Sequence, residues 1–187
     1  MTTMNKIIAI DNKQLQGHVH DIIRQMLQAD WRPHYVVGIT RGGLVPAVMI
    51  SQYLDVPMHT LGISFRDAEL GPESNLWMAE DAFGYINKEE RTNEDEVSDV
   101  HRRSNILIVD DINDSGRTLQ WIKDDWQSGC MPHSEAWNSV WHHNVKFACI
   151  VNNDASNFKE VDLCGLTINK QEDPSWVEFP WENWWTK

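Results

Sequence analysis

The most constraining feature of this chain is an apolar run, Ile106-Leu107-Ile108-Val109, that leads directly into two aspartates. Three of its four residues are β-branched, and polar and apolar side chains do not alternate along it. Such a run is typical of a strand that is covered on both faces, as in a parallel sheet. The sequence therefore predicts a central parallel strand that carries Asp110 and Asp111 at its carboxyl end.

The other predicted elements alternate between helix and strand. Apolar residues at helical spacing predict helices over 13–30 and 44–54, and a third is expected over 118–127. Strands are expected at 35–39, 58–65, 147–151 and 161–168. This alternation is typical of βαβ crossovers, so we predict an α/β fold with a mainly parallel sheet, in a single domain over 1–187.

Charge and composition limit the classes of function. Acidic residues outnumber basic ones by 28 to 16, a formal net charge of −12, which argues against a broad nucleic-acid surface. No apolar run approaches the ~18 residues of a membrane helix, and the first residues lack the apolar core of a signal peptide. The three cysteines are odd in number and far apart. We therefore expect a cytoplasmic protein with reduced thiols and no membrane contact.

A polar turn follows the two aspartates and leads into a predicted helix. It contains Ser115, Gly116 and Thr118. The first amides of a helix lack internal partners and bind anions, the glycine permits close approach, and the hydroxyls add donors. Carboxylates beside such a site accept hydrogen bonds from sugar hydroxyls, so the pattern predicts a phosphorylated ribose as ligand. A helix that is merely capped by aspartate is the alternative.

A second polar turn opens the helix over 44–54. Its residues are Thr40, Arg41, Gly42 and Gly43. Helix amides and the Arg41 guanidinium together suit the oxygens of a diphosphate. A plain glycine turn with an exposed arginine is the alternative.

Three motifs carry a resemblance to a known family. ILIVDDINDSGRT, at 106–118, resembles the phosphoribosyl-diphosphate signature of type I phosphoribosyltransferases, and Asp114 is typical of their 6-oxopurine branch. Residues 40–46 are similar to the diphosphate loop of the bacterial xanthine-guanine enzymes, and 176–182 to their base-binding tail. The resemblance covers roughly 35–182 and implies a central sheet flanked by helices, a small hood from the chain termini and a long flap.

The resemblance also implies a role for each motif. The ribose binds at Asp110 and Asp111, and the diphosphate at residues 40–43. The 5-phosphate is bound by Asp114, Ser115, Gly116, Arg117 and Thr118. Asp114 is the catalytic candidate, because a carboxylate beside the base can exchange a proton with a ring nitrogen. The flexible flap falls at 66–105 and the hood and tail at 169–187.

The base site departs from the family pattern at one position. Trp176 is expected to stack on the base, and the main chain near Val177 to meet its exocyclic groups. In the 6-oxopurine enzymes a lysine follows the strand that here spans 147–151. Asn153 takes its place in this chain and is the candidate base contact, without a charge. The identity of the base therefore stays open.

Magnesium is the metal that the resemblance implies. It arrives with the diphosphate and is held mainly by substrate oxygens and water, with Asp110 and Asp111 as candidate ligands. No cysteine pair at zinc spacing accompanies His133, His142 and His143, so the role of that region stays open.

The implied activity is purine salvage. 5-Phosphoribose passes from phosphoribosyl diphosphate to a purine-like base, which gives a nucleoside monophosphate and diphosphate. The alternative is a non-catalytic regulator or nucleotide sensor on the same fold. A phosphorelay receiver with Asp154 as acceptor is a third reading, disfavoured by the long stretch of chain before Ile106. Members of the family are dimers or tetramers, so we expect self-association.

Overall fold

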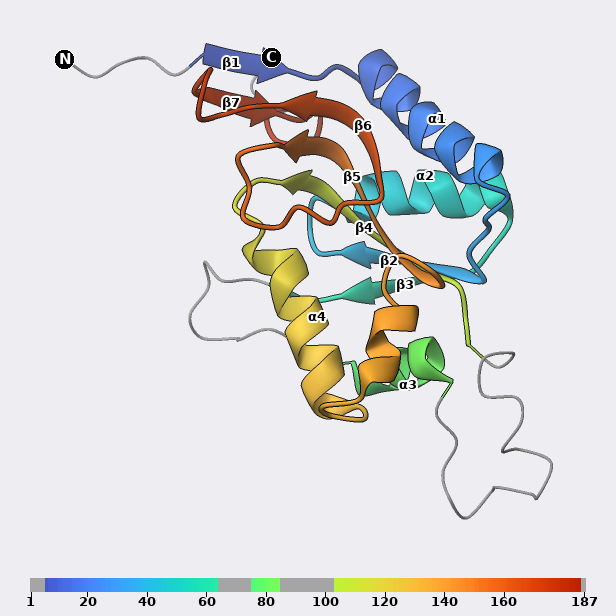
Figure 1. Cartoon of the computed structure of the whole chain (residues 1–187). Coiled ribbons are helices and arrows are strands. Elements are labelled where there is room, and N and C mark those ends of the chain that lie inside the picture. Colours follow the sequence, from blue (N-terminus) through green and yellow to red (C-terminus); the bar gives the residue numbers. More distant parts are fainter. Residues whose placement is uncertain (1–5, 64–74, 85–102, 186–187) are drawn as a thin grey trace, which may run out of the picture.

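The structure is a computed structural model, which describes residues 6–63, 75–84 and 103–185 (Figure 1). The helices are α1 (Asn12–Gln28), α2 (Leu44–Leu54), α3 (Leu76–Phe83), α4 (Arg117–Gly129) and the 3-10 helix η3 (Glu135–Ser139). The strands are β1 (Lys6–Ala9), β2 (Tyr35–Ile39), β3 (Met58–Leu61), β4 (Ile106–Asn113), β5 (Val145–Asn153), β6 (Leu163–Ile168) and β7 (Ser175–Glu178).

A five-stranded sheet forms the centre of the molecule. Its strand order is β3-β2-β4-β5-β6, and every neighbouring pair is parallel. The apolar run 106–109 lies in the middle strand, β4, with each side chain 0% exposed. The predicted α/β fold with a parallel sheet is therefore confirmed.

Helices cover both faces of this sheet (Figure 1). On one face, the buried stripe of α1 packs with α2 in one apolar core. On the other face, α3 and α4 share a second core that is rich in aromatic rings. Because a core lies on each side of the sheet, the β4 side chains on both faces are buried. This explains why apolar and polar residues do not alternate along the strand.

Helix α1 shows how local sequence starts an element. Asp11 accepts a hydrogen bond from the Gln14 amide, and the Gln14 side chain accepts one from the Asp11 amide. This capping box satisfies donors that a helix start leaves without partners. The buried stripe then follows at helical spacing: Leu15, Val19, Ile22, Ile23 and Met26.

The segment predicted as a flap over 66–105 contains one described helix. Met78, Ala79 and Ala82 of α3 are buried against the second core, and Gly84 ends the helix at a φ of 74°. Residues 66–74 and 85–102 of the predicted flap lie outside the described residues. The sequence did not predict α3, because its apolar stripe is short and lies inside a polar stretch. It also did not predict β1 and η3, whose patterns are equally short.

The two ends of the chain form the hood. β1 pairs with β7 in parallel, from Lys6 with Ser175 to Ala9 with Glu178, and the Ile10 amide donates to the Glu178 carbonyl at 2.9 Å. Val177 and Phe179 are buried and join the core beneath α1. Within the described residues, no helix has both the length and the apolar character needed to cross a bilayer.

Helix α4 begins at a position that only glycine fits. Gly116 has a φ of +85°, and a Cβ placed there would lie 2.4 Å from the Phe158 backbone nitrogen. The backbone at Gly116 therefore packs closely against the loop after β5, at the point where the predicted phosphate turn leads into α4.

Gly116→Ala is expected to lower the free energy of unfolding by more than about 2 kcal/mol, because left-handed strain adds to a backbone clash. Urea unfolding followed by circular dichroism measures this. Gly17→Ala is the matched control: it lies in α1 with no atom within 4 Å of its added Cβ. It should raise stability by roughly 0.5–1 kcal/mol. Equal effects of the two substitutions would contradict this account.

Candidate functional site

The acidic pair lies at the carboxyl end of the central strand. Asp110 is 9% exposed. Backbone amides hold both carboxylates: Asp111 N donates to Asp110 Oδ1, and Ile112 N donates to Asp111 Oδ1, each at 2.9 Å. The carboxylates are therefore oriented before any ligand binds.

Burial raises the pKa of both carboxyl groups. The pKa of Asp110 lies well above its usual value, chiefly through loss of water and then through the charge of Asp111. Burial is also the largest cause of the raised pKa of Asp111. Among these causes there is no cationic side chain, so the pair is suited to a ligand that brings hydroxyl donors or a cation.

The predicted diphosphate loop packs directly against this pair. A Cβ on Gly42 would lie 1.8 Å from Asp111 Oδ2, and one on Gly43 would lie 2.4 Å from the Val109 carbonyl oxygen. The Thr40–Arg41 peptide bond is cis, and Arg41 is exposed. No side chain caps the start of α2 after Gly43. The structure thus brings residues 40–43 and 110–111 together at one end of the sheet.

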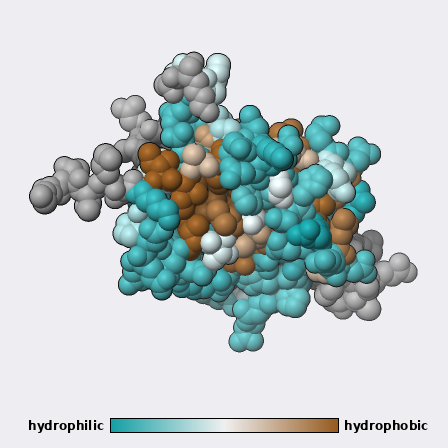
Figure 2. Space-filling model, turned by 90° about the horizontal axis from the view of Figure 1, so that it is seen from above, coloured by the Kyte–Doolittle hydropathy of each residue, from teal (hydrophilic) through white to brown (hydrophobic). Residues whose placement is uncertain are grey.

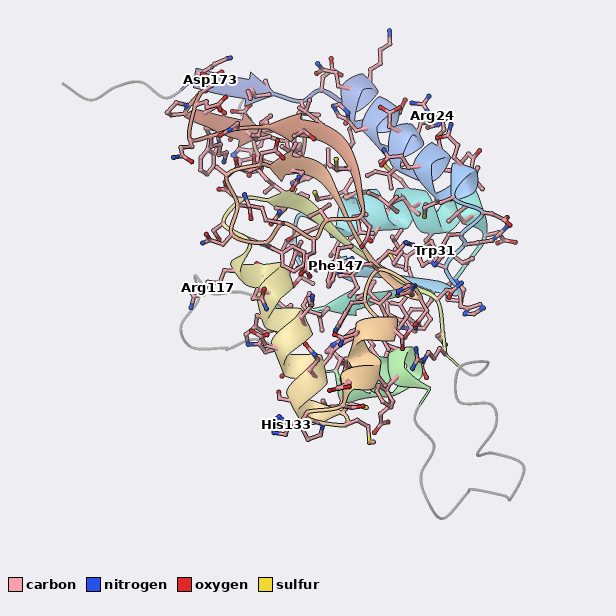
Figure 3. All side chains as sticks on the ribbon, viewed as in Figure 1. Arg24, Trp31, Arg117, His133, Phe147 and Asp173 are labelled. Carbon is pink, nitrogen blue, oxygen red and sulfur yellow. The ribbon has the colours of Figure 1, made fainter. Side chains whose placement is uncertain are left out.

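The predicted phosphate turn leads from β4 into α4. Asp114, Ser115 and Arg117 are exposed, and the Arg117 side chain projects from the start of α4 (Figure 3). No side chain caps α4 at Gly116, and the Arg117 amide lies 3.4 Å from Ser115 Oγ. The Asn157 amide donates to the Ser115 carbonyl at 3.2 Å, which ties the turn to the loop after β5.

Asp114 lies in a small network that the sequence did not reveal. Its Oδ1 is 2.9 Å from Lys170 Nζ, and its carbonyl accepts a hydrogen bond from Asn153 Nδ2 at 3.0 Å. Asn153 Oδ1 in turn accepts from the amides of Ala155 and Lys170. The side chain of Asn153 is therefore bonded to the protein at both its oxygen and its nitrogen. Lys170 belongs to no motif and has no pattern that could have pointed to it.

The tail reaches the same end of the molecule. The charge of Glu182 contributes to the raised pKa of Asp111, and Glu182 Oε2 accepts a hydrogen bond from the Phe179 amide at 2.9 Å. On β7, Trp176 is 49% exposed while Val177 is 5% exposed. The indole is thus available to a ligand, whereas the Val177 side chain belongs to the core.

The carboxylates of Asp110 and Asp111 fit a role as some of the ligands of a magnesium ion. Carboxylate oxygens are hard ligands of the kind that Mg²⁺ takes. Across the described ranges, no group of three or more His, Cys, Asp or Glu side chains is arranged to hold a metal ion. Such an ion would therefore take most of its ligands from substrate and water.

The histidine region lies away from this site. His142 precedes β5, at the amino end of the strands, and its ring contacts Asp162 at 3.0 Å and Glu160 at 3.3 Å. The hydrogen bond with Asp162 is the main cause of its raised pKa. We assign His142 to a surface ion-pair group that joins β5 to the following loop.

Asp110→Asn is expected to change how stability depends on pH. The native pKa of Asp110 exceeds its unfolded value, so its contribution to stability is complete below about pH 4 and is lost as pH rises through the native pKa. The amide lacks this titration, so the variant should gain stability relative to the parent as the pH rises from 4 to 7.

Urea unfolding at pH 4, 5.5 and 7 measures this difference. The exposed Glu172→Gln is the control and should leave the pH profile unchanged. A D110N profile parallel to that of the parent protein would refute the assignment.

Comparison with known proteins identifies the family of this chain. Residues 9–183 match the model of the phosphoribosyl transferase domain. The chain is 36% identical over 154 residues to a xanthine-guanine phosphoribosyltransferase of Cereibacter sphaeroides, covering 81% of this chain and 70% of that protein. It is 21% identical to xanthine phosphoribosyltransferase 1 of Saccharomyces cerevisiae, over 95% of this chain and 90% of that one.

Solved structures share the fold. The Helicobacter pylori xanthine-guanine-hypoxanthine phosphoribosyltransferase superposes with a TM-score of 0.60 at 18% identity, covering 94% of this chain and 93% of that one. A Neisseria gonorrhoeae protein with bound ppGpp gives 0.59, also at 18% identity, covering 96% and 90%. The match of residues 9–183 to the family model and the 36% identity to the Cereibacter sphaeroides enzyme show that this chain belongs to the phosphoribosyltransferases, a family of transferase enzymes.

Proposed function

We propose that this enzyme transfers 5-phosphoribose from phosphoribosyl diphosphate to a purine-like base, which yields a nucleoside monophosphate and diphosphate. One observation carries the proposal: the loop 40–43 packs against the acidic pair, and the turn 114–118 continues from the same strand. A phosphorylated ribose that carries a diphosphate has negative charge at both ends and hydroxyls between them. Two anion-binding turns with carboxylates between them match that distribution of groups.

The position of each group supports the role that this proposal gives it. The amides and hydroxyls of 114–118 bind the 5-phosphate, Asp110 and Asp111 accept from the ribose hydroxyls, and 40–43 bind the diphosphate. The exposed face of Trp176 stacks on the base, and the main chain at Val177 meets its edge. Asn153, proposed from the sequence as a base contact, is bonded to Asp114 and Lys170 and acts by positioning them.

The chemical step is a substitution at the sugar carbon. The bond from that carbon to the diphosphate oxygen breaks, and its electron pair leaves with diphosphate. A ring nitrogen of the base forms the new bond, and the base's surplus proton passes to the Asp114 carboxylate. Magnesium, when bound with the substrate, neutralises charge on the leaving diphosphate.

The proposal also covers the cellular location and the oligomeric state of the protein. Cys130, Cys149 and Cys164 are free thiols, as expected in the reducing cytoplasm.

Apolar side chains gather on the face seen in Figure 2, where the hood strands and α1 lie. We take this face as support for assembly into a dimer or tetramer, which light scattering measures.

A coupled assay with phosphoribosyl diphosphate, Mg²⁺ and hypoxanthine, guanine, xanthine or adenine tests the activity. We expect turnover with at least one purine. Tight binding of phosphoribosyl diphosphate without turnover of any of the four would overturn the transferase proposal and favour a sensor on the same fold.

Trp176→Ala is expected to raise KM for the base by roughly 5- to 100-fold, because stacking on an aromatic ring contributes about 1–3 kcal/mol. Its effect on KM for phosphoribosyl diphosphate should be small. Trp184→Ala is the matched control, since this indole is 72% exposed and has no assigned role. A base KM that is equal in the two variants would exclude Trp176 from the base site.

A further inference from the structure

A buried asparagine lies directly before the predicted phosphate turn. Asn113 is the last residue of β4 and is 2% exposed. Its Nδ2 donates to Asn152 Oδ1 at 2.8 Å and to the Phe158 carbonyl at 2.9 Å, and its Oδ1 accepts from Ser156 Oγ at 3.0 Å. Both N–H groups of the side-chain amide are therefore used. This one side chain joins the end of β4 to β5 and to the loop that follows β5.

We call residues 154–158 of that loop the backing loop, because it contacts the phosphate turn at two points. The Asn157 amide donates to the Ser115 carbonyl at 3.2 Å, and the Phe158 backbone nitrogen would lie 2.4 Å from a Cβ on Gly116. No side chain caps α4 at Gly116, and the Arg117 amide lies as far as 3.4 Å from Ser115 Oγ. The position of the turn therefore depends on the backing loop.

Ser156 helps to fix the conformation of the backing loop. This serine is 2% exposed, and its Oγ accepts from the Phe158 amide at 3.2 Å while it donates to Asn113 Oδ1. The Phe158 ring holds the end of the loop in the second core. Buried polar groups are costly unless they are hydrogen-bonded, and a network whose members are bonded to one another permits few other arrangements. Asn113 and Ser156 thus hold the backing loop in one position beside the turn.

An anion site made of backbone amides needs such a support. Amides at a helix start bind a phosphate well when several N–H groups point at it together. Hydrogen bonds weaken steeply outside a narrow range of distance and angle, so a displaced turn would lose several contacts with a phosphate at once.

We propose that Asn113 is a positioning residue for the 5-phosphate site, because it holds the backing loop against the turn 114–118 and so directs the amides of that turn toward the phosphate. This inference rests on the proposed function, which takes the turn to bind the 5-phosphate. Ser156 belongs to the same network. Both side chains are buried, so they act on the substrate through the backbone of Ser115 and Gly116.

Calorimetry with two ligands tests the role of Asn113. Ribose 5-phosphate probes the turn 114–118, and inorganic diphosphate with Mg²⁺ probes the loop 40–43. Asn113→Ala should weaken the binding of ribose 5-phosphate by about 10-fold or more, roughly the effect of one lost hydrogen bond to a charged group. Its affinity for diphosphate should equal that of the parent. In the coupled assay, KM for phosphoribosyl diphosphate should rise while KM for the base stays constant.

Two further variants complete the design. Ser156→Ala removes one neutral hydrogen bond of the network and should weaken ribose 5-phosphate by roughly 2- to 5-fold. Asn144→Ala is the matched control: Asn144 also donates two hydrogen bonds from Nδ2, to the Ala82 and Ser104 carbonyls at 2.8 and 2.9 Å, but it precedes β5 at the opposite end of the strands. N144A should lower stability and keep the parent's affinity for ribose 5-phosphate.

The outcomes separate this inference from the proposed function. N113A decides the question when it folds, and S156A decides it when N113A does not. An unchanged affinity for ribose 5-phosphate in the deciding variant would overturn the inference, as would an equal loss of affinity for both ligands, which a merely structural role would produce.

The parent protein supplies the remaining distinction. A parent protein that binds no ribose 5-phosphate would overturn the inference. A parent protein that binds it but turns over no purine would overturn the proposed transferase activity alone, and the two affinities would still decide whether Asn113 positions the turn.

Discussion

The site depends on the close packing of two glycines against the end of the central strand. Gly42 and Gly43 touch Asp111 and the Val109 carbonyl so closely that neither position has room for a Cβ. This contact brings a loop from early in the chain to the acidic pair. Any side chain there would move the loop 40–43 away from the end of β4 and from the turn 114–118 that follows it. The close approach of this loop to the acidic pair thus depends on the absence of two side chains.

The acidic pair is costly to bury. Both carboxyl groups are withdrawn from water, and burial raises their pKa values. Proteins tolerate such groups where a ligand compensates for the lost water. Hydroxyl groups and a magnesium ion brought by the substrate would both do so. Under the proposed function, the protein gives up stability in the free state so that these carboxylates can orient the ribose, which lowers the cost of reaching the transition state.

Asp114 is held by contacts from two other segments of the chain. Its carboxylate meets Lys170, and Asn153 ties the two segments together by hydrogen bonds to both. Three elements contribute: the end of β4, the end of β5 and the segment after β6. Asn153 stands where the 6-oxopurine enzymes carry a lysine, and the ammonium of Lys170, from another part of the chain, lies beside the Asp114 carboxylate. Small changes in any of the three segments would move the Asp114 carboxylate, which we propose to lie at the base.

Local sequence determined the elements on which the site is built. The apolar run 106–109 required a strand covered on both faces, and β2 and α2 have the predicted bounds because short-range patterns specify them. The two turns were recognisable because binding an anion with helix amides needs glycines and hydroxyls at a helix start. Only the tertiary structure decided which distant groups meet there: Lys170 with Asp114, Glu182 with Asp111, and β1 with β7. Those contacts join residues far apart in the chain, and no local periodicity records them, because they form only after the sheet and its covering helices have fixed where each segment runs.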